Sequence, residues 1–132
     1  ILDLMNGLKE KLGTAIMLIT HDLGVVAQVC DRVMVMYAGR VIESASVREV
    51  FHTPQHPYTR ALLESIPKSE AREHGKRLPT IPGIVPSLTE LPHGCRFQDR
   101  CEFKEQRCVD SEPELETHGE RSFRCHLPLG GA

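Results

Sequence analysis

Tryptophan is absent from this chain of 132 residues, and aromatic residues make up only 5% of it. No apolar run reaches the roughly 18 residues that a transmembrane helix needs, so we do not expect the chain to cross a membrane. The basic residues form no stripe interleaved with aromatic side chains, and the formal net charge is −2. A nucleic-acid-binding module is therefore poorly supported, and no nucleic-acid partner is expected.

The composition changes partway along the chain. A length of 132 residues allows one ordinary domain, or a small domain with an appendage. Residues 1–66 contain the long aliphatic runs, whereas residues 67–132 are rich in Pro, Gly, Arg and Glu. Five prolines between residues 67 and 93 exclude a helix there and predict an extended linker. We therefore predict two parts, with a boundary near Pro67.

The first part alternates between helical and strand patterns. Apolar residues at helical spacing predict a helix over residues 1–12, ended by Gly13. Residues 15–20 are a continuous apolar run, which is typical of a parallel strand buried on both faces. Asp22 can cap a short helix over residues 23–29. This order predicts an α/β fold that contains part of a parallel sheet.

A hairpin and two short helices are predicted next. Residues 33–37 and 40–44 are expected to form two strands joined at Ala38-Gly39, as a hairpin at the edge of a sheet. A short helix is expected over residues 47–51. Another helix is expected to begin at Pro57, because proline is well tolerated at the first helical position.

Four of the five cysteines are crowded near the end of the chain, in the spacing C-x5-C-x6-C-x16-C. They are Cys95, Cys101, Cys108 and Cys125. Thiolates suit zinc or an iron–sulfur cluster, whereas in an oxidising compartment the four could close two disulfides. Structural zinc sites commonly use C-x2-4-C pairs, and none occurs here. A cluster with separate iron atoms tolerates wider spacing, so we favour it and leave zinc and disulfides open.

The surroundings of these cysteines allow several interpretations. His93 and His126 are close enough in sequence to replace a cysteine in a zinc site. Basic residues nearby could offset the charge of four thiolates, or could be ordinary solvated side chains. They are Arg96, Arg100, Lys104, Arg107, Arg121 and Arg124. This part has too few apolar residues for a core of its own, which a bound metal centre would compensate. Cys30, outside the group, is expected to be a small buried apolar residue.

Several motifs together resemble one family. His21 directly follows the predicted buried strand, at the end where α/β sheets bind ligands. The runs 20–22, 31–36 and 39–43 resemble the region around the switch histidine in ATP-binding subunits of ABC transporters. Residues 56–63 resemble the signature that follows the ATPase core in oligopeptide and dipeptide importers. With Ile81-Pro82-Gly83 and the four cysteines, the resemblance covers nearly the whole chain.

The resemblance implies a C-terminal fragment of the ATPase subunit of such an importer. Residues 1–66 would be the end of a P-loop NTPase domain, and residues 67–132 a proline-rich linker followed by a small irregular module with a metal cluster. The subunit would couple ATP hydrolysis to import of oligopeptides, dipeptides or related substrates such as nickel complexes. Its partners would be transmembrane permease subunits and a second ATPase subunit, with a solute-binding protein as an indirect partner. It would lie at the cytoplasmic face of the cell membrane.

The resemblance also implies roles for individual residues. His21 would be the switch histidine, whose imidazole hydrogen-bonds the terminal phosphate of ATP and helps to orient the attacking water. Asp22 would cap a helix and take no part in the chemistry. Cys95, Cys101, Cys108 and Cys125 would be the ligands of a [4Fe–4S] cluster with a structural role. ATP and Mg²⁺ would be bound by the intact subunit.

The chain also departs from the family pattern. No G-x-x-x-x-G-K-[ST] loop is present, and Gly75-Lys76-Arg77 does not supply one. The motifs that bring the magnesium-binding Asp and the catalytic Glu are absent as well. The chain starts at Ile1 inside a helical pattern, so we expect a fragment that by itself neither binds ATP tightly nor hydrolyses it. Its exposed strand edge is expected to cause self-association.

Two other functions compete with this interpretation. The chain could be a binding module, stabilised by zinc or by a cluster, with no role in an ATPase. It could also be an electron carrier, since one iron–sulfur cluster can pass electrons. Metal content and reduction potential would separate these alternatives.

Overall fold

The structure, a computed structural model, describes residues 2–66 and 80–130. Two helices come first, α1 (Leu2–Leu12) and α2 (Leu23–Val29). The first ends where Gly13 adopts a φ of 60°, which a glycine accepts without strain. The second begins after Asp22, whose carboxylate accepts the backbone N–H groups of Gly24 and Val25 at 2.9 and 3.1 Å. Both predicted helices and the Asp22 cap are confirmed.

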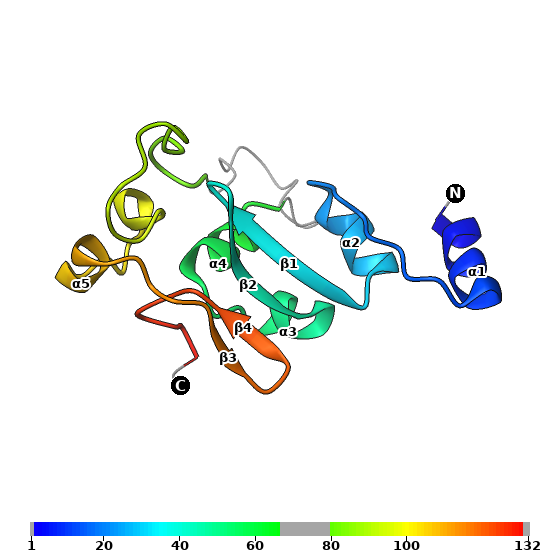
Figure 1. Ribbon diagram of the computed structural model, residues 1–132. Coiled ribbons are helices and arrows are strands. Elements are labelled where there is room, and N and C mark those ends of the chain that lie inside the picture. The colour runs from blue at the N-terminus through cyan, green and yellow to red at the C-terminus, as the bar shows by residue number, and fades with distance from the viewer. Residues whose placement is uncertain (1, 67–79, 131–132) are drawn as a thin grey trace.

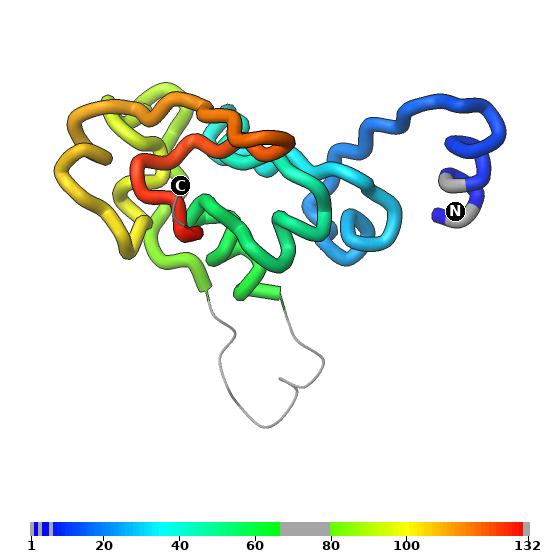
Figure 2. Tube along the Cα trace, turned by 90° about the horizontal axis from the view of Figure 1, so that it is seen from below, coloured from blue at the N-terminus to red at the C-terminus, as the bar shows by residue number. Residues whose placement is uncertain are grey.

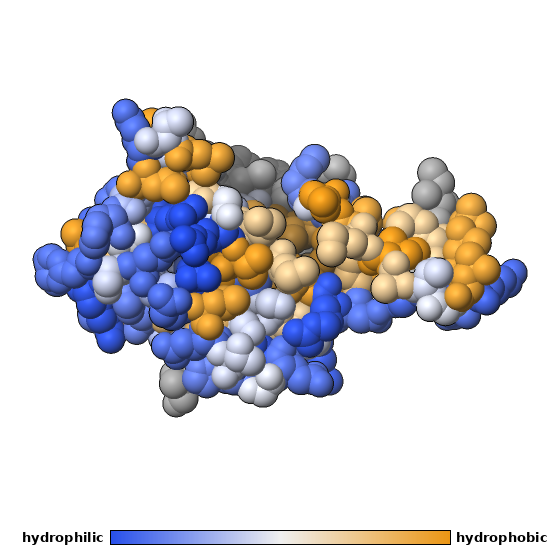
Figure 3. Space-filling view, viewed as in Figure 1, coloured by the Kyte–Doolittle hydropathy of each residue, from blue (hydrophilic) through white to orange (hydrophobic). Residues whose placement is uncertain are grey.

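The strand predicted between these helices is wrong. Residues 15–20 are irregular, and Met17 and Ile19 are 79% and 92% exposed. A strand buried on both faces needs hydrogen-bonded neighbours, and the strands of the described residues pair only with one another. Figure 3 accordingly shows apolar surface at the end of the molecule that carries α1 and α2.

The sheet is small and entirely antiparallel. Its strands are β1 (Arg32–Tyr37), β2 (Arg40–Ser46), β3 (Glu116–His118) and β4 (Arg121–Phe123), in the order β1-β2-β4-β3. Among the described residues there is thus no parallel sheet, although the mixed α/β class is confirmed. The sheet lies in the middle of the molecule in Figure 1.

The predicted hairpin is present, but it is not wholly at an edge. β1 and β2 are joined by Ala38 and Gly39, with φ of 44° and 79°, as in the tight turns that match strand twist. β1 is an edge strand, whereas β2 lies between β1 and β4. The prediction failed because β4 is only three residues long and carries no periodic signal.

Two short helices cover one face of the hairpin, α3 (Val47–His52) and α4 (Pro57–Glu64). Both were predicted. The core, to which α3 contributes Val50, consists of Val35, Tyr37, Ile42, Ala45, Val50 and Phe97. The Phe97 ring lies 5.3 Å from that of Tyr37 and 5.4 Å from that of Tyr58, measured between centroids. The cysteine-rich part therefore shares the core of the hairpin, as its own shortage of apolar residues would require.

The remaining elements carry the cysteines. Residues 80–97 form no helix or strand, and they are followed by a 3-10 turn, η2 (Gln98–Arg100), and by α5 (Gln106–Asp110). The C-terminal tail returns to the loop before α4, where the backbone N–H of Leu129 donates to the carbonyl of Gln55 at 2.9 Å (Figure 2). The boundary predicted near Pro67 falls on residues outside those described and stays a prediction. No described helix has the length and apolar character to span a membrane.

A candidate four-cysteine site

The four predicted ligands lie around one small cavity, here called the cysteine cavity. Cys95, Cys101, Cys108 and Cys125 all line it. Cys95 and Cys101 flank η2, Cys108 lies in α5, and Cys125 follows β4. All four are free thiols. Three separate segments between residues 95 and 125 thus line the same cavity.

The thiols lie in an apolar environment with few hydrogen-bond donors. Burial raises the pKa of Cys95 and Cys101, and it raises the pKa of Cys125 to about 12. The backbone N–H of Leu127 donates to the sulfur of Cys125 at 3.3 Å, which partly opposes the rise of its pKa. The backbone at Phe97 and Phe103 partly opposes the rise of the pKa of Cys95 and Cys101. A positively charged centre in the cavity would favour the thiolate form of these groups.

The arrangement does not by itself establish a metal centre. In the part of the chain that the structure describes, no set of three or more His, Cys, Asp and Glu residues is arranged to hold a metal ion. This counts against a single zinc ion, whose sulfur ligands converge on one point at about 2.3 Å. Four cysteines that line one cavity and form no disulfide nevertheless have the chemistry of iron–sulfur ligands.

The two histidines considered for a zinc site differ in position. His126 lines the cysteine cavity, but its Nε2 lies 3.0 Å from the carbonyl oxygen of Ser111. His93 is exposed and is not among the residues that line the cavity. Neither position favours a histidine as a metal ligand.

A third histidine, His56, lines the cavity and was missed by the sequence analysis. It is 1% exposed and caps α4, where its Nδ1 accepts the backbone N–H of Tyr58 at 3.0 Å. Burial lowers the pKa of His56 to about 3, so the imidazole is neutral at physiological pH. Its place before Pro57, the first helical residue, marks it as an N-cap and could have revealed it.

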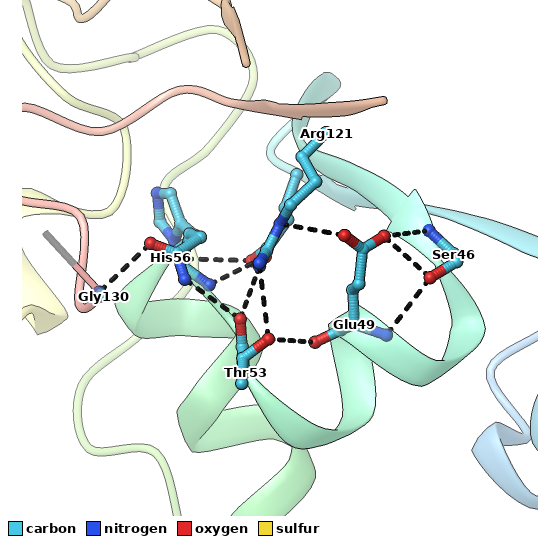
Figure 4. Close-up of polar contacts among 8 residues, drawn as sticks. Ser46, Glu49, Thr53, His56, Arg121 and Gly130 are labelled. Carbon is cyan, nitrogen blue, oxygen red and sulfur yellow. Dashed lines mark hydrogen bonds and ion pairs between the residues drawn. The ribbon is translucent and has the colours of Figure 1, made fainter. Parts of the chain in front are cut away.

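A buried carboxylate holds the loop that carries His56. Glu43 of β2 is 1% exposed, and its two oxygens accept the backbone N–H groups of Gln55 at 2.7 Å and His56 at 2.9 Å. Arg121 of β4 donates to the carbonyl of Thr53 in the same loop and lies 3.9 Å from Glu43. Figure 4 shows Arg121 between this loop and α3. The loop before α4 is thereby joined to the sheet and to the cysteine-rich part.

The basic residues near the cysteines act mainly as ties between loops. Arg96 donates to the carbonyl of Ala38 at 2.6 Å, and Arg100 donates to those of Pro82 and Ile81 at 2.8 and 3.0 Å. Arg124 likewise reaches the carbonyl of Pro113 at 2.9 Å. Arg107 and Lys104 are exposed and pair with nearby carboxylates. The sequence analysis did not predict these contacts of Arg96, Arg100 and Arg124, because the spacing of residues does not indicate which backbone carbonyls a side chain will reach.

His21 lies elsewhere. It is exposed in the segment between α1 and α2, next to the Asp22 cap. Figures 1 and 2 place α2 and α5 towards opposite ends of the molecule, so the structure does not bring His21 together with the cysteines. Cys30 follows α2 and is half-buried, less enclosed than expected.

A comparison with known proteins defines the class. Residues 42–108 match the family described as "Oligopeptide/dipeptide transporter, C-terminal region", a match that includes α4 and three of the four cysteines. The chain belongs to this family. The resemblance to ATP-binding subunits of peptide importers is thus confirmed.

Named relatives agree with this family. A protein of Brucella ovis that is named as a peptide import ATP-binding protein is 48% identical over 94% of this chain and 39% of its own length. An oligopeptide transport ATP-binding protein of Haemophilus influenzae is 48% identical over 91% of this chain and 37% of its own length. A protein of Sinorhizobium fredii, named as an ATP-binding protein of a peptide ABC transporter, is 55% identical over 87% of this chain and 34% of its own length. The chain therefore spans less than two thirds of each relative.

Proposed function

We propose that this chain is part of the ATP-binding subunit of an ABC importer for peptides. The observation that carries the proposal is the family match over residues 42–108, and the names of the relatives support it. The intact subunit would bind ATP and Mg²⁺, and would work with permease subunits and a second ATPase subunit at the cytoplasmic face of the membrane. A solute-binding protein would deliver the peptide, or a related substrate such as a nickel complex.

Within this subunit, Cys95, Cys101, Cys108 and Cys125 would hold a [4Fe–4S] cluster with a structural role. Their common cavity and their free thiols support this assignment. The backbone N–H of Leu127, which donates to the sulfur of Cys125 at 3.3 Å, supports it further, because such donors stabilise thiolate ligands. The cluster, when bound, would fasten together the three segments that carry the cysteines.

His21 would contact the terminal phosphate of ATP. Its exposure leaves the imidazole free to reach a ligand supplied by another part of the intact subunit, and Asp22 is occupied as a helix cap. An imidazole N–H there would stabilise the charge that develops during hydrolysis. The remaining catalytic groups would come from outside this chain, since the phosphate-binding motif is absent from its sequence.

The cluster is tested on the intact subunit purified without oxygen. We expect a brown protein with about four irons and four sulfides per chain. Replacing Cys125 with Ser should lower the iron content, whereas replacing Cys30 with Ser should leave it unchanged. A colourless protein that contains one zinc would contradict the cluster and favour a zinc-stabilised binding module.

The role of His21 is tested by ATP hydrolysis in the same protein. The variant His21→Ala should lose activity by roughly 10²- to 10³-fold, because one preorganised donor to the transferring group is removed. Its iron content should remain that of the wild type. The variant His52→Ala, at another exposed histidine, serves as the control. Undiminished turnover in His21→Ala would remove the assigned role.

A further inference from the structure

His56 lines the cysteine cavity, and only one of its two ring nitrogens makes a hydrogen bond among the described residues. Its Nδ1 accepts the N–H of Tyr58 at 3.0 Å, so this nitrogen carries the lone pair. In the neutral ring the proton must then lie on Nε2, which is a donor. The hydrogen bonds among the described residues include none from Nε2. The Nε2–H is therefore available to an acceptor that lies in the cavity.

The cavity itself offers one main kind of acceptor. Besides the cysteines and two histidines it is lined by Pro57, Phe97, Gln98 and Leu127. Apart from the imidazole of His126, the side-chain acceptors that line the cavity are thus the sulfur atoms and the amide of Gln98. The backbone N–H of Leu127 already donates to the sulfur of Cys125 at 3.3 Å, so N–H donation to sulfur occurs at this site.

The position of the imidazole is fixed from two directions. The backbone N–H of His56 donates to Glu43, and its Nδ1 caps α4. The ring also lies 5.9 Å from that of Phe97, between centroids, next to the cysteine cavity. Turning the side chain away would break the cap and expose the first turn of α4.

We propose that His56 is a positioning residue that donates its Nε2–H to a sulfur atom of the four-cysteine site. This inference rests on the proposed [4Fe–4S] cluster and deepens it. An N–H donor stabilises the extra negative charge of a cluster that has accepted one electron. His56 would thus raise the reduction potential of the cluster, since hydrogen bonds to sulfur are among its determinants.

The test uses the variant His56→Asn in the intact, anaerobically purified subunit. The Asn side-chain oxygen can keep the cap of α4, but its amide nitrogen would lie short of the position of Nε2. The matched control is His126→Asn, because His126 lines the same cavity but its Nε2 already contacts Ser111. The midpoint potential is measured by titration with dithionite, followed by electron paramagnetic resonance. Iron content is measured in parallel.

We expect the equilibrium constant for reduction to fall about tenfold in His56→Asn, which is about 59 mV for a one-electron couple. The control should stay close to the wild type. An unchanged potential in His56→Asn at wild-type iron content would overturn the inference, and so would an equal shift in both variants. A wild-type protein without iron would instead overturn the cluster itself.

A second measurement applies if His56→Asn fails to retain iron. The reduced wild type, labelled with ¹⁵N-histidine, is then studied by pulsed paramagnetic resonance. A nitrogen coupling to the cluster that persists in His126→Asn is the expected result. Absence of any such coupling would overturn the donor role of His56.

Discussion

Among single residues, Glu49 shows how hydrogen bonds at a helix cap lower the pKa of a carboxyl group. The hydroxyl and the backbone N–H of Ser46 donate to the Glu49 carboxylate at 2.7 and 3.1 Å, and these bonds lower its pKa below 4.5. Because the folded pKa lies below the unfolded value, this group stabilises the fold above pH 4.5. That stabilisation is lost as the pH falls through the folded pKa.

Replacing Ser46 with Ala should therefore raise the pKa of Glu49 towards 4.5. Titration of the Glu49 carboxyl by nuclear magnetic resonance measures this directly. Ser65→Ala is the control, since the Ser65 hydroxyl donates to the carbonyl of Leu62 and not to a carboxylate. An identical Glu49 titration in Ser46→Ala and the wild type would show that the cap does not set this pKa.

Glu43 leads to a prediction about stability, because its side chain is buried. In Glu43→Gln one side-chain oxygen becomes an NH₂ group that faces a backbone N–H of Gln55 or His56. One donor is then left unsatisfied, at a cost of about 1–3 kcal/mol in the free energy of unfolding. Urea denaturation measures the change. Glu90→Gln, at an exposed position, should stay within about 0.5 kcal/mol of the wild type, and an equally small change in Glu43→Gln would contradict the prediction.

The residues that sequence reasoning found and missed differ in the range of their contacts. Asp22 was predicted as a cap because its partners lie two and three residues further along. Glu43 binds groups twelve and thirteen residues away, and nothing in its strand pattern indicates that it is buried. His56 was missed because imidazole is not among the usual N-cap side chains.

At the level of elements, local sequence patterns were sufficient to predict the helices and the hairpin. They did not predict which strands pair. The helices α1 to α4 and the β1–β2 hairpin follow from apolar spacing, caps and one turn. Residues 15–20 have a sequence suited to a buried strand, but this state also requires neighbouring strands. The described residues contain none beside them, so this segment remains irregular. Strand formation is thus a property of the sheet and not of the segment alone.

Gly94 links the cysteine segments through its lack of a side chain. A Cβ at this position would lie 2.2 Å from the carbonyl oxygen of Cys108 and 2.5 Å from that of Val109. The close approach allows the backbone N–H of Cys95 to donate to Cys108 at 2.8 Å. Gly94→Ala must therefore push the Cys95 segment away from α5 and break this bond.

We expect Gly94→Ala to lower the free energy of unfolding by about 1–3 kcal/mol or more. Chemical denaturation measures the loss, and iron content should fall in parallel if the cluster is present. Gly7→Ala in α1 is the control, because nothing lies within 4 Å of its Cβ position. That variant should be stabilised by about 0.5–1 kcal/mol, as expected for alanine within a helix. Wild-type stability in Gly94→Ala would exclude the proposed packing.

Across the whole molecule, composition and tertiary structure divide the chain differently. The change near Pro67 suggested two parts, yet β4 completes the sheet of the first part and Phe97 completes its core. Composition indicates which segments have enough apolar residues to fold alone, whereas the pairing of the strands shows which segments depend on one another for folding. The gathering of four cysteines could be proposed from a family resemblance, but their common cavity depends on this long-range pairing.

Self-association is the prediction that belongs to the molecule as a whole. Apolar side chains such as Leu4, Met17 and Ile19 are exposed at the end of the molecule that carries α1 and α2 (Figure 3). Burying this surface is favourable, so this chain by itself should form dimers or larger assemblies at micromolar concentration. Size-exclusion chromatography with light scattering measures the mass.

The double variant Met17→Lys, Ile19→Lys should shift the population towards the monomer, because association would then bury two charges. Thr14→Lys adds a charge at a neighbouring exposed position and should leave association largely intact. A stable monomer of the unmodified chain would show that its apolar end does not drive association. Equal effects of the two variants would mean that net charge, and not this apolar surface, controls the assembly.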